Sequence, residues 1–182
     1  LRRLVTVSFL YAAMLSPNNI YIPYSAATLA GASLTEAGWA AAAAQIGAVG
    51  GRLMWGAAAD RLGSPRAVLV MLGVAMAAAV TLFAQMAPDW PVAARLGAAL
   101  ALGATGAGWG GVTLAQVTRV VPRAEVGTAT TAMMIFNYLG VFIGPPLVAL
   151  ALVVTGDLRL ALMTLAAGAL AGAALAWRGL RS

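Results

Sequence analysis

The residue with the most distinctive chemistry in this sequence is Arg52, a guanidinium inside a long apolar run. It precedes Asp60 by two helical turns, about 12 Å along a helix axis. In lipid, a charge at that depth costs about 3 kcal/mol or more and is tolerated where it faces a cavity or a partner. Two interpretations follow. Either Arg52 lines a cavity and holds an anionic substrate or a carboxylate from elsewhere, or it snorkels to the interface and is structural.

Polar residues also recur at helical spacing in several apolar runs. Their sets are Tyr11, Asn18, Tyr21 and Ser25; Gln45 and Arg52; Thr105, Trp109, Thr113 and Gln116; and Thr130 and Asn137. Polar groups inside a membrane face a cavity or a neighbouring helix, so hydrogen bonding between helices is the alternative for each one. We predict a shared substrate pathway formed by Asn18, Tyr21, Gln45, Arg52, Trp109, Thr113, Gln116 and Asn137.

The composition places these residues in a lipid bilayer. Of the 182 residues 62% are hydrophobic and only 9% are charged, whereas a soluble domain carries about 25% charged residues. A soluble chain of this length cannot bury so much apolar surface. The sequence therefore predicts an integral membrane protein.

Six apolar segments are each long enough to cross a bilayer as a helix, and none shows the alternation of a barrel strand. They form one domain over residues 1–182, an all-α membrane bundle. The predicted transmembrane helices are approximately residues 4–30, 35–59, 67–87, 92–121, 124–154 and 157–177. The first and fourth contain interruptions, Pro17 with Pro23 and a cluster of glycines. Such segments mark the substrate pathway in transporters built from repeats of three helices.

The arginines predict the orientation of these helices. If the N-terminus is cytoplasmic, the helix ends on that side carry Arg2, Arg3, Arg61, Arg66, Arg119, Arg123, Arg178 and Arg181, and the other side carries only Arg95 and Arg159. The positive-inside rule then places both termini in the cytoplasm. We expect the protein in the plasma (inner) membrane.

The sequence lacks the residue types that several kinds of function require. The chain has no Cys and no His, which excludes disulfides, thiolate chemistry and imidazole relays. No nucleotide-binding loop, nucleophile–base pair or metal cluster appears, so we predict neither an enzyme nor a cofactor. The arginines form no stripe, which argues against nucleic acid as a partner. The five acidic residues lie near helix ends, so no carboxylate in this chain is placed for proton coupling.

A short loop carries the clearest motif. Gly56-x-x-x-Asp60-Arg61-x-Gly63-x-x-Arg66 lies between the second and third predicted helices, and it resembles the cytoplasmic loop signature of the major facilitator superfamily. Gly140-x-x-x-Gly144-Pro145 resembles an element of that family's fifth helix. The resemblance implies a cytoplasmic gate formed by Gly56, Asp60, Arg61, Gly63, Arg66 and Arg119. Asp60 ends its helix, where a carboxylate is unfavourable without a partner. Arg119 or the start of the fifth helix is expected to supply one.

The resemblance also implies one six-helix half of a transporter, which would work by alternating access with a second half. Arg52, before Gly56, is typical of the C-terminal half, and the start at Arg2-Arg3 without Met is what a cut in the central loop would leave. The expected partners are a small-molecule substrate, for which Arg52 suggests an organic anion, the lipid bilayer and the other half. The alternatives are a half-size protein that works as a dimer, and a scaffold or receptor on the same fold that transports nothing.

Overall fold

This computed structural model describes residues 2–179, which are almost entirely helical. The elements are α1 (Arg2–Leu15), α2 (Asn18–Ala30), α3 (Leu34–Leu62), α4 (Pro65–Ala84), α5 (Val92–Gly106), α6 (Trp109–Val120), a 3₁₀ turn η1 (Arg123–Glu125), α7 (Val126–Thr155) and α8 (Leu158–Gly179). The predicted all-α class is confirmed. The predicted count of six helices is not confirmed, because two of the predicted runs are each divided into two helices.

The first division separates α1 from α2 at Ser16 and Pro17. Proline has no N–H to continue the ladder and its ring crowds the preceding turn. The carbonyl of Pro17 instead accepts hydrogen bonds from the N–H groups of Ile20 and Tyr21, which start α2. Pro23 lies inside α2 without ending it. The interruption was therefore predictable from Pro17, but the prediction of one continuous helix over 4–30 is wrong.

The second division separates α5 from α6 at Ala107 and Gly108. Glycine pays the largest conformational cost in a helix and allows close packing, so a glycine-rich segment is a weak point. The predicted helix over 92–121 is thus two shorter helices. The other predicted boundaries differ from the observed ones by a few residues.

The turn between α3 and α4 follows directly from its residues. Gly63 ends α3 in the left-handed region, at φ 60°, and its N–H donates to the carbonyl of Ala59. The Ser64 hydroxyl accepts from the N–H of Ala67, and Pro65 occupies the first turn of α4. Glycine after a helix, then a hydroxyl cap and proline at the next start, is the expected order for such a turn.

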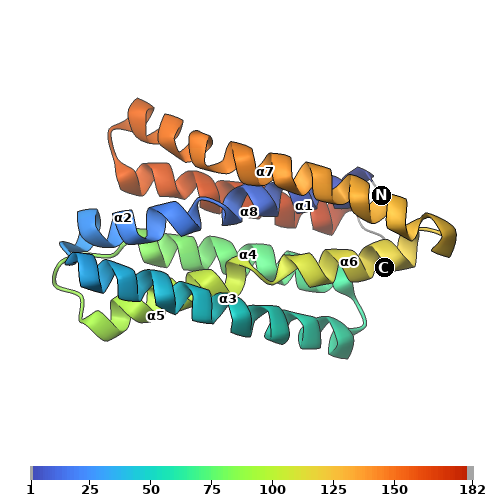
Figure 1. Cartoon of the computed structure of the whole chain (residues 1–182), viewed down its shortest axis with the longest axis horizontal. Coiled ribbons are helices and arrows are strands. Elements are labelled where there is room, and N and C mark those ends of the chain that lie inside the picture. The colour runs from blue at the N-terminus through green and yellow to red at the C-terminus, as the bar shows by residue number, and fades with distance from the viewer. Residues whose placement is uncertain (1, 180–182) are drawn as a thin grey trace.

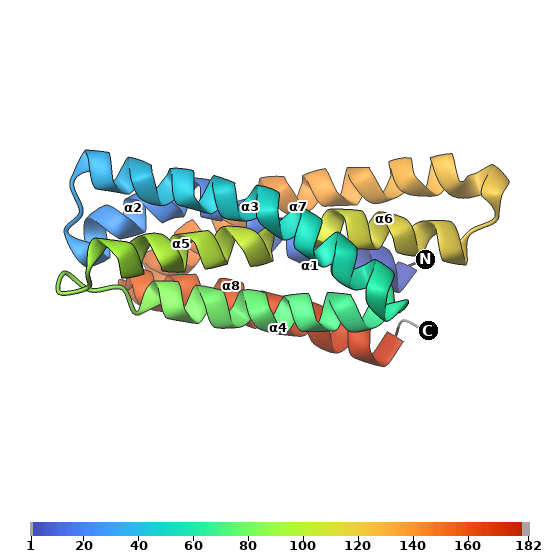
Figure 2. The same ribbon diagram turned by 90° about the horizontal axis from the view of Figure 1, so that it is seen from below.

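The helices form an up-and-down bundle (Figures 1 and 2). The closest pairs are α3 with α5, α4 with α8, and α1 with α7. Both ends of the described chain lie at the same end of the bundle as the α3–α4 turn and the α6–α7 link (Figure 2). We call this the arginine-rich end, because Arg2, Arg3, Arg61, Arg66, Arg119, Arg123 and Arg178 belong to its helix ends and links. Arg181 lies outside the described residues.

Glycines bring α3 and α5 into backbone contact. A Cβ at Gly47, Gly51 or Gly103 would collide with the backbone carbonyl of Leu100, Ala104 or Ala44, respectively. Gly140 and Gly144 allow α7 to approach α1 in the same way, against the carbonyls of Phe9 and Ala13. Small residues at helix interfaces are how membrane helices pack, since lipid supplies no hydrophobic force between them. These glycines therefore allow the close packing of the helices.

Four stretches of residues 2–179 are long and apolar enough to cross a membrane. They are Pro65–Ala84, Val92–Val120, Arg123–Thr155 and Leu158–Arg178. The stretch containing α7 is the least covered, with 17% of its most apolar window buried, against 56% for α4. The side of the bundle formed by α7 is therefore open to lipid or to another protein surface.

Candidate functional site

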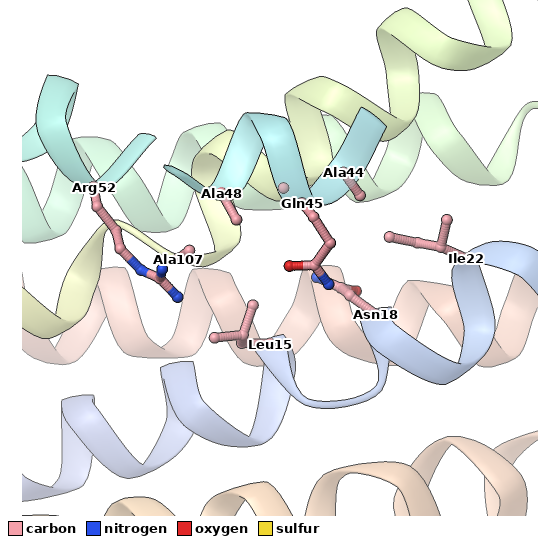
Figure 3. A pocket seen from close by; sticks show the side chains of 9 residues that line it. Leu15, Asn18, Ile22, Ala44, Gln45, Ala48, Arg52 and Ala107 are labelled. Carbon is pink, nitrogen blue, oxygen red and sulfur yellow. The ribbon is translucent and has the colours of Figure 1, made fainter. Parts of the chain in front are cut away.

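A cavity of about 70 Å³ lies in the bundle where both helix divisions meet α3. We call it the central cavity. Its lining residues come from α1 and α2, from α3, and from the α5–α6 segment: Leu15, Asn18, Ile22, Ala44, Gln45, Ala48, Arg52, Gly103 and Ala107. Figure 3 shows Arg52 reaching from α3 toward Leu15 and Ala107, while the amide ends of Gln45 and Asn18 point toward one another. Three of the predicted pathway residues are thus brought together.

Two helices begin at this cavity. Asn18 is the first residue of α2, and Trp109, two residues after the lining residue Ala107, is the first of α6. Neither start has a side-chain cap, since Pro17 and Gly108 occupy the cap positions. The first N–H groups of a helix have no partner within it, and the helix dipole makes that end positive. The negative ends of α1 and α5 lie beside these two starts, so Arg52 is the group that favours negative charge at the cavity.

Asn18 has a hydrogen-bonding group with nothing to bind. Its side chain is 5% exposed, and its Nδ2 atom has no hydrogen-bond partner among the described residues. The indole Nε1 of Trp109 is likewise buried and without a partner in this part of the chain. An unsatisfied buried donor costs about 1–3 kcal/mol, so a bound acceptor would recover that cost.

Trp55 holds the α5–α6 division in place. Its indole Nε1 donates to the carbonyl of Ala104 at 3.0 Å, and a Cβ on Gly108 would collide with its ring. The interrupted helix would otherwise leave the Ala104 carbonyl without a partner, because Gly108, four residues on, belongs to the interruption. Sequence reasoning missed Trp55; its eight-residue separation from Gly47 on α3 placed it on the face toward α5, which was the available signal.

The remaining predicted pathway residues lie elsewhere. The Tyr21 hydroxyl donates to the carbonyl of Pro145 at 3.4 Å, and the Asn137 side chain accepts from the Ser8 hydroxyl at 2.5 Å. These two bonds join α1 and α2 to α7, which is the interhelical alternative. The Thr113 hydroxyl donates to the carbonyl of Gly110 at 2.9 Å within its own helix. None of these three residues lines the central cavity.

The predicted face of α6 is divided for a geometric reason. The spacing from Thr105 to Trp109 assumed a continuous helix, but the chain breaks at Ala107 and Gly108. Thr105 bonds to the carbonyls of Ala101 and Leu102 in its own helix. Gln116 lines a second cavity at the arginine-rich end instead of the central one.

The loop motif is organised by backbone contacts. Arg119 donates from Nη1 to the carbonyl of Gly63 at 2.9 Å, which ties α6 to the α3–α4 turn. Arg66 donates to the carbonyl of Trp177 and lies over its ring at 5.2 Å. Asp60 and Arg61 are exposed, and within residues 2–179 Asp60 forms no ion pair. Arg119 therefore binds the turn that follows Asp60, in contrast to the expected Asp60–Arg119 pair. Gly56 is half-buried, with open space beside its Cα.

The residues that sequence reasoning did not single out at the central cavity are apolar. Leu15, Ile22, Ala44, Ala48, Gly103 and Ala107 supply most of its wall. Their types carry no chemical signal, and only the folding of three separate segments together shows their role. Among the described residues, no group of three His, Cys, Asp or Glu side chains is placed to hold a metal ion.

The fold is that of a membrane-embedded α-helical bundle in which two helices are interrupted beside a polar cavity. The sequence profile of the Major Facilitator Superfamily matches residues 4–182, and the chain belongs to this family of membrane transporters. The resemblance drawn from the loop motif is therefore confirmed. A comparison with curated proteins found no match.

Proposed function

We propose that this chain is one six-helix half of a secondary or facilitative transporter that moves a small organic anion by alternating access. The observation that carries the proposal is the central cavity, where Arg52, the unpartnered Nδ2 of Asn18 and the start of α2 meet. Arg52 has no hydrogen-bond or ion-pair partner among the described residues. A guanidinium kept without a counter-ion is available to a substrate that must bind and later leave.

The physical argument favours an anion over a neutral solute. Arginine binds carboxylates with two parallel hydrogen bonds. Half-helix starts that face a site near the bilayer midplane stabilise anionic groups. In a rocking mechanism, two bundles move about such a site, so the second half would complete the cavity on the side where Arg52 and Gln45 are exposed.

The first experiment measures substrate binding and transport by the full-length protein. Purified protein is screened for thermal stabilisation by small carboxylates, by neutral sugars and by organic cations, and hits are tested for uptake into proteoliposomes. We expect carboxylates to stabilise, and Arg52→Ala and Arg52→Lys to abolish uptake without loss of expression. Arg123→Ala, in the exposed link at the arginine-rich end, is the matched control. Wild-type uptake in Arg52→Ala would refute the substrate role.

We further propose that Gly56, Asp60, Arg61, Gly63, Arg66 and Arg119 form a cytoplasmic gate. The bond from Arg119 to the Gly63 carbonyl fixes the turn, and the exposed Asp60 carboxylate is left for a helix start or a cation that approaches in the outward-facing state. Because the chain has no cysteine, a single Ala57→Cys reports access from the cytoplasmic side. Asp60→Asn should raise its labelling rate; an unchanged rate would exclude the gate.

The second half is proposed to cover α7 and the open side of the central cavity. Large side chains on α7 such as Phe142 (78% exposed) and Tyr138 (69% exposed) have no cover within the described residues. Sequencing of the full-length gene separates the possibilities: six further apolar runs indicate a two-half protein, and their absence indicates a half-size protein that pairs with another chain. A receptor or scaffold would bind ligand but show no uptake.

The orientation proposal places the arginine-rich end in the cytoplasm of the plasma (inner) membrane, because the positive-inside rule counts the arginines of short loops. Ser33→Cys and Ser64→Cys lie at opposite ends of α3 and test the orientation in intact cells. Ser33→Cys should react with an impermeant reagent and Ser64→Cys should not. The reverse pattern would overturn the orientation.

A further inference from the structure

A second cavity, of about 230 Å³, lies at the arginine-rich end beside the α3–α4 turn. We call it the end cavity. Its lining residues are Gly63, Ser64, Pro65, Arg66, Gln116, Arg119 and Val120. It includes two arginines and no acidic residue, so its wall carries net positive charge. The proposed transport function assigns no ligand to it.

The two arginines are held in position but are not neutralised. Arg119 uses one donor on the Gly63 carbonyl, and Arg66 uses one on the Trp177 carbonyl while its guanidinium lies over the Trp177 ring. A guanidinium has five N–H donors, so each keeps donors for another acceptor. Within residues 2–179, neither arginine forms an ion pair with a carboxylate. These are fixed cations whose counter-charge is supplied by nothing in the described chain.

Gln116 is the second, independent sign of a ligand. Its side chain is 5% exposed, yet it makes no hydrogen bond to any described residue, and it lines the end cavity. Its amide N–H and C=O groups are thus available to a ligand in the cavity. Gln116 therefore points to an acceptor that occupies the cavity.

The first turn of α4 completes the arrangement. Ser64 and Pro65 line the cavity at the start of this 20-residue helix, and Arg66 follows in its first turn. Helix starts bind phosphate through their free N–H groups and the positive end of the helix dipole. We propose that the end cavity binds a phosphate group, held by Arg66, Arg119, Gln116 and the start of α4.

Phosphate suits this site better than a carboxylate because four donor groups on two helices line it. Arg66 and the helix start lie on α4, and Gln116 and Arg119 lie on α6, whereas a carboxylate offers only two oxygens. The arginine-rich end also coincides with the depth at which phospholipid head groups lie, where basic residues attract anionic lipids. The phosphate belongs either to such a head group or to a soluble ion.

The experiment compares both sources on the full-length protein. Thermal unfolding is followed in nanodiscs of phosphatidylcholine alone and of an equal mixture with phosphatidylglycerol. Binding of inorganic phosphate to detergent-solubilised protein is measured by calorimetry at low salt. Stabilisation only by phosphatidylglycerol assigns the site to a lipid head group, and binding of inorganic phosphate assigns it to a soluble phosphate. Neither response in the wild type would overturn the proposal.

Variants test the residues. Arg119→Gln and Gln116→Leu should each weaken phosphate binding about tenfold or more, since each removes a hydrogen bond to a charged group. Gln116→Glu keeps the side-chain shape, repels phosphate and serves if Gln116→Leu does not fold. Arg123→Gln removes an exposed arginine at the same end that does not line the cavity and should leave binding unchanged. An equal loss in this control would show a general charge effect and would refute the site.

Discussion

The two arginine-lined cavities differ in how their cations are held. In the central cavity, Arg52 is exposed and has no partner among the described residues. In the end cavity, Arg66 and Arg119 are each anchored on a backbone carbonyl. An unanchored guanidinium adapts to a ligand that arrives and leaves, whereas an anchored one forms a fixed binding surface. The same residue type is therefore expected to serve exchange at one place and permanent binding at the other.

The largest effect that would break this comparison is expected from Asn18→Asp. It places a carboxylate beside Arg52 in the central cavity, where it would pair with the guanidinium and exclude an anionic substrate. We expect substrate affinity to fall about a hundredfold or more, as for loss of a charged hydrogen-bond pair. Asn18→Ala should retain part of the affinity. Binding assays that show equal effects would remove Arg52 from the site.

A smaller effect is expected from Gly103→Ala, which changes the wall of the central cavity but not that of the end cavity. Gly103 lines the central cavity, and a Cβ there collides with the Ala44 carbonyl. Overpacking of this kind costs about 1–3 kcal/mol. Thermal unfolding should shift downward and substrate binding should weaken, while phosphate binding at the end cavity stays constant. Gly97→Ala is the control, because its Cβ would meet nothing within 4 Å.

The anchoring of Arg66 is tested by Trp177→Leu. The ring lies 5.2 Å from the guanidinium, and an exposed cation–π contact contributes about 0.5–1 kcal/mol. We expect a small loss of thermal stability and weaker phosphate binding, with substrate binding unaffected. Trp177→Phe retains an aromatic ring and should lie between the variant and the wild type. An effect on substrate binding would show that the two cavities are not independent.

The smallest effect concerns pH, and it lies outside both cavities. The Ser33 backbone N–H donates to the Glu36 carboxylate at 2.8 Å, and this bond, followed by the Ser33 hydroxyl, holds the pKa of Glu36 below its ordinary value. The carboxylate therefore stabilises the fold above the unfolded-state pKa, about 4.3, and the benefit is lost as pH falls through the lower folded-state value. The free energy of unfolding should be measured from pH 6 to below about pH 4.3. It should decrease slightly as the pH falls, and Glu36→Gln should remove that dependence.

The sequence predicted the class of fold and the position of its turns because these depend on local chemistry. Apolar runs of sufficient length require helices in lipid, and Gly63 with Ser64 and Pro65 defines a helix end and the next start. The glycine cluster marked the fourth predicted helix as interrupted, but the place where α5 divides from α6 was not predicted. It depends on Trp55, which contacts Gly108 from another helix, and such a contact does not appear in any single segment.

Only the polar residues of the candidate site could be predicted, because they stand out within apolar segments. Asn18, Gln45 and Arg52 share one cavity, as expected for polar groups inside a membrane. Tyr21 and Asn137 did not join them, because each has a hydrogen-bond partner on a neighbouring helix. Gln116 follows the interruption between α5 and α6, which changes the direction in which the residues of α6 face, and it lines the end cavity instead. Helical spacing predicts a shared face only while the helix is continuous.

Tyr11 has a consequence for the order in which the protein is assembled. Its hydroxyl donates to the Leu69 carbonyl on α4 at 2.7 Å, and its ring fills a slot that a Cβ on Gly73 of α4 or Gly172 of α8 would close. Because α8 follows α1 in the chain, the packing of the Tyr11 ring is completed only after α8 has been inserted. The hydrogen bond of its hydroxyl needs only α4, so the two contacts of this side chain form at different stages of synthesis.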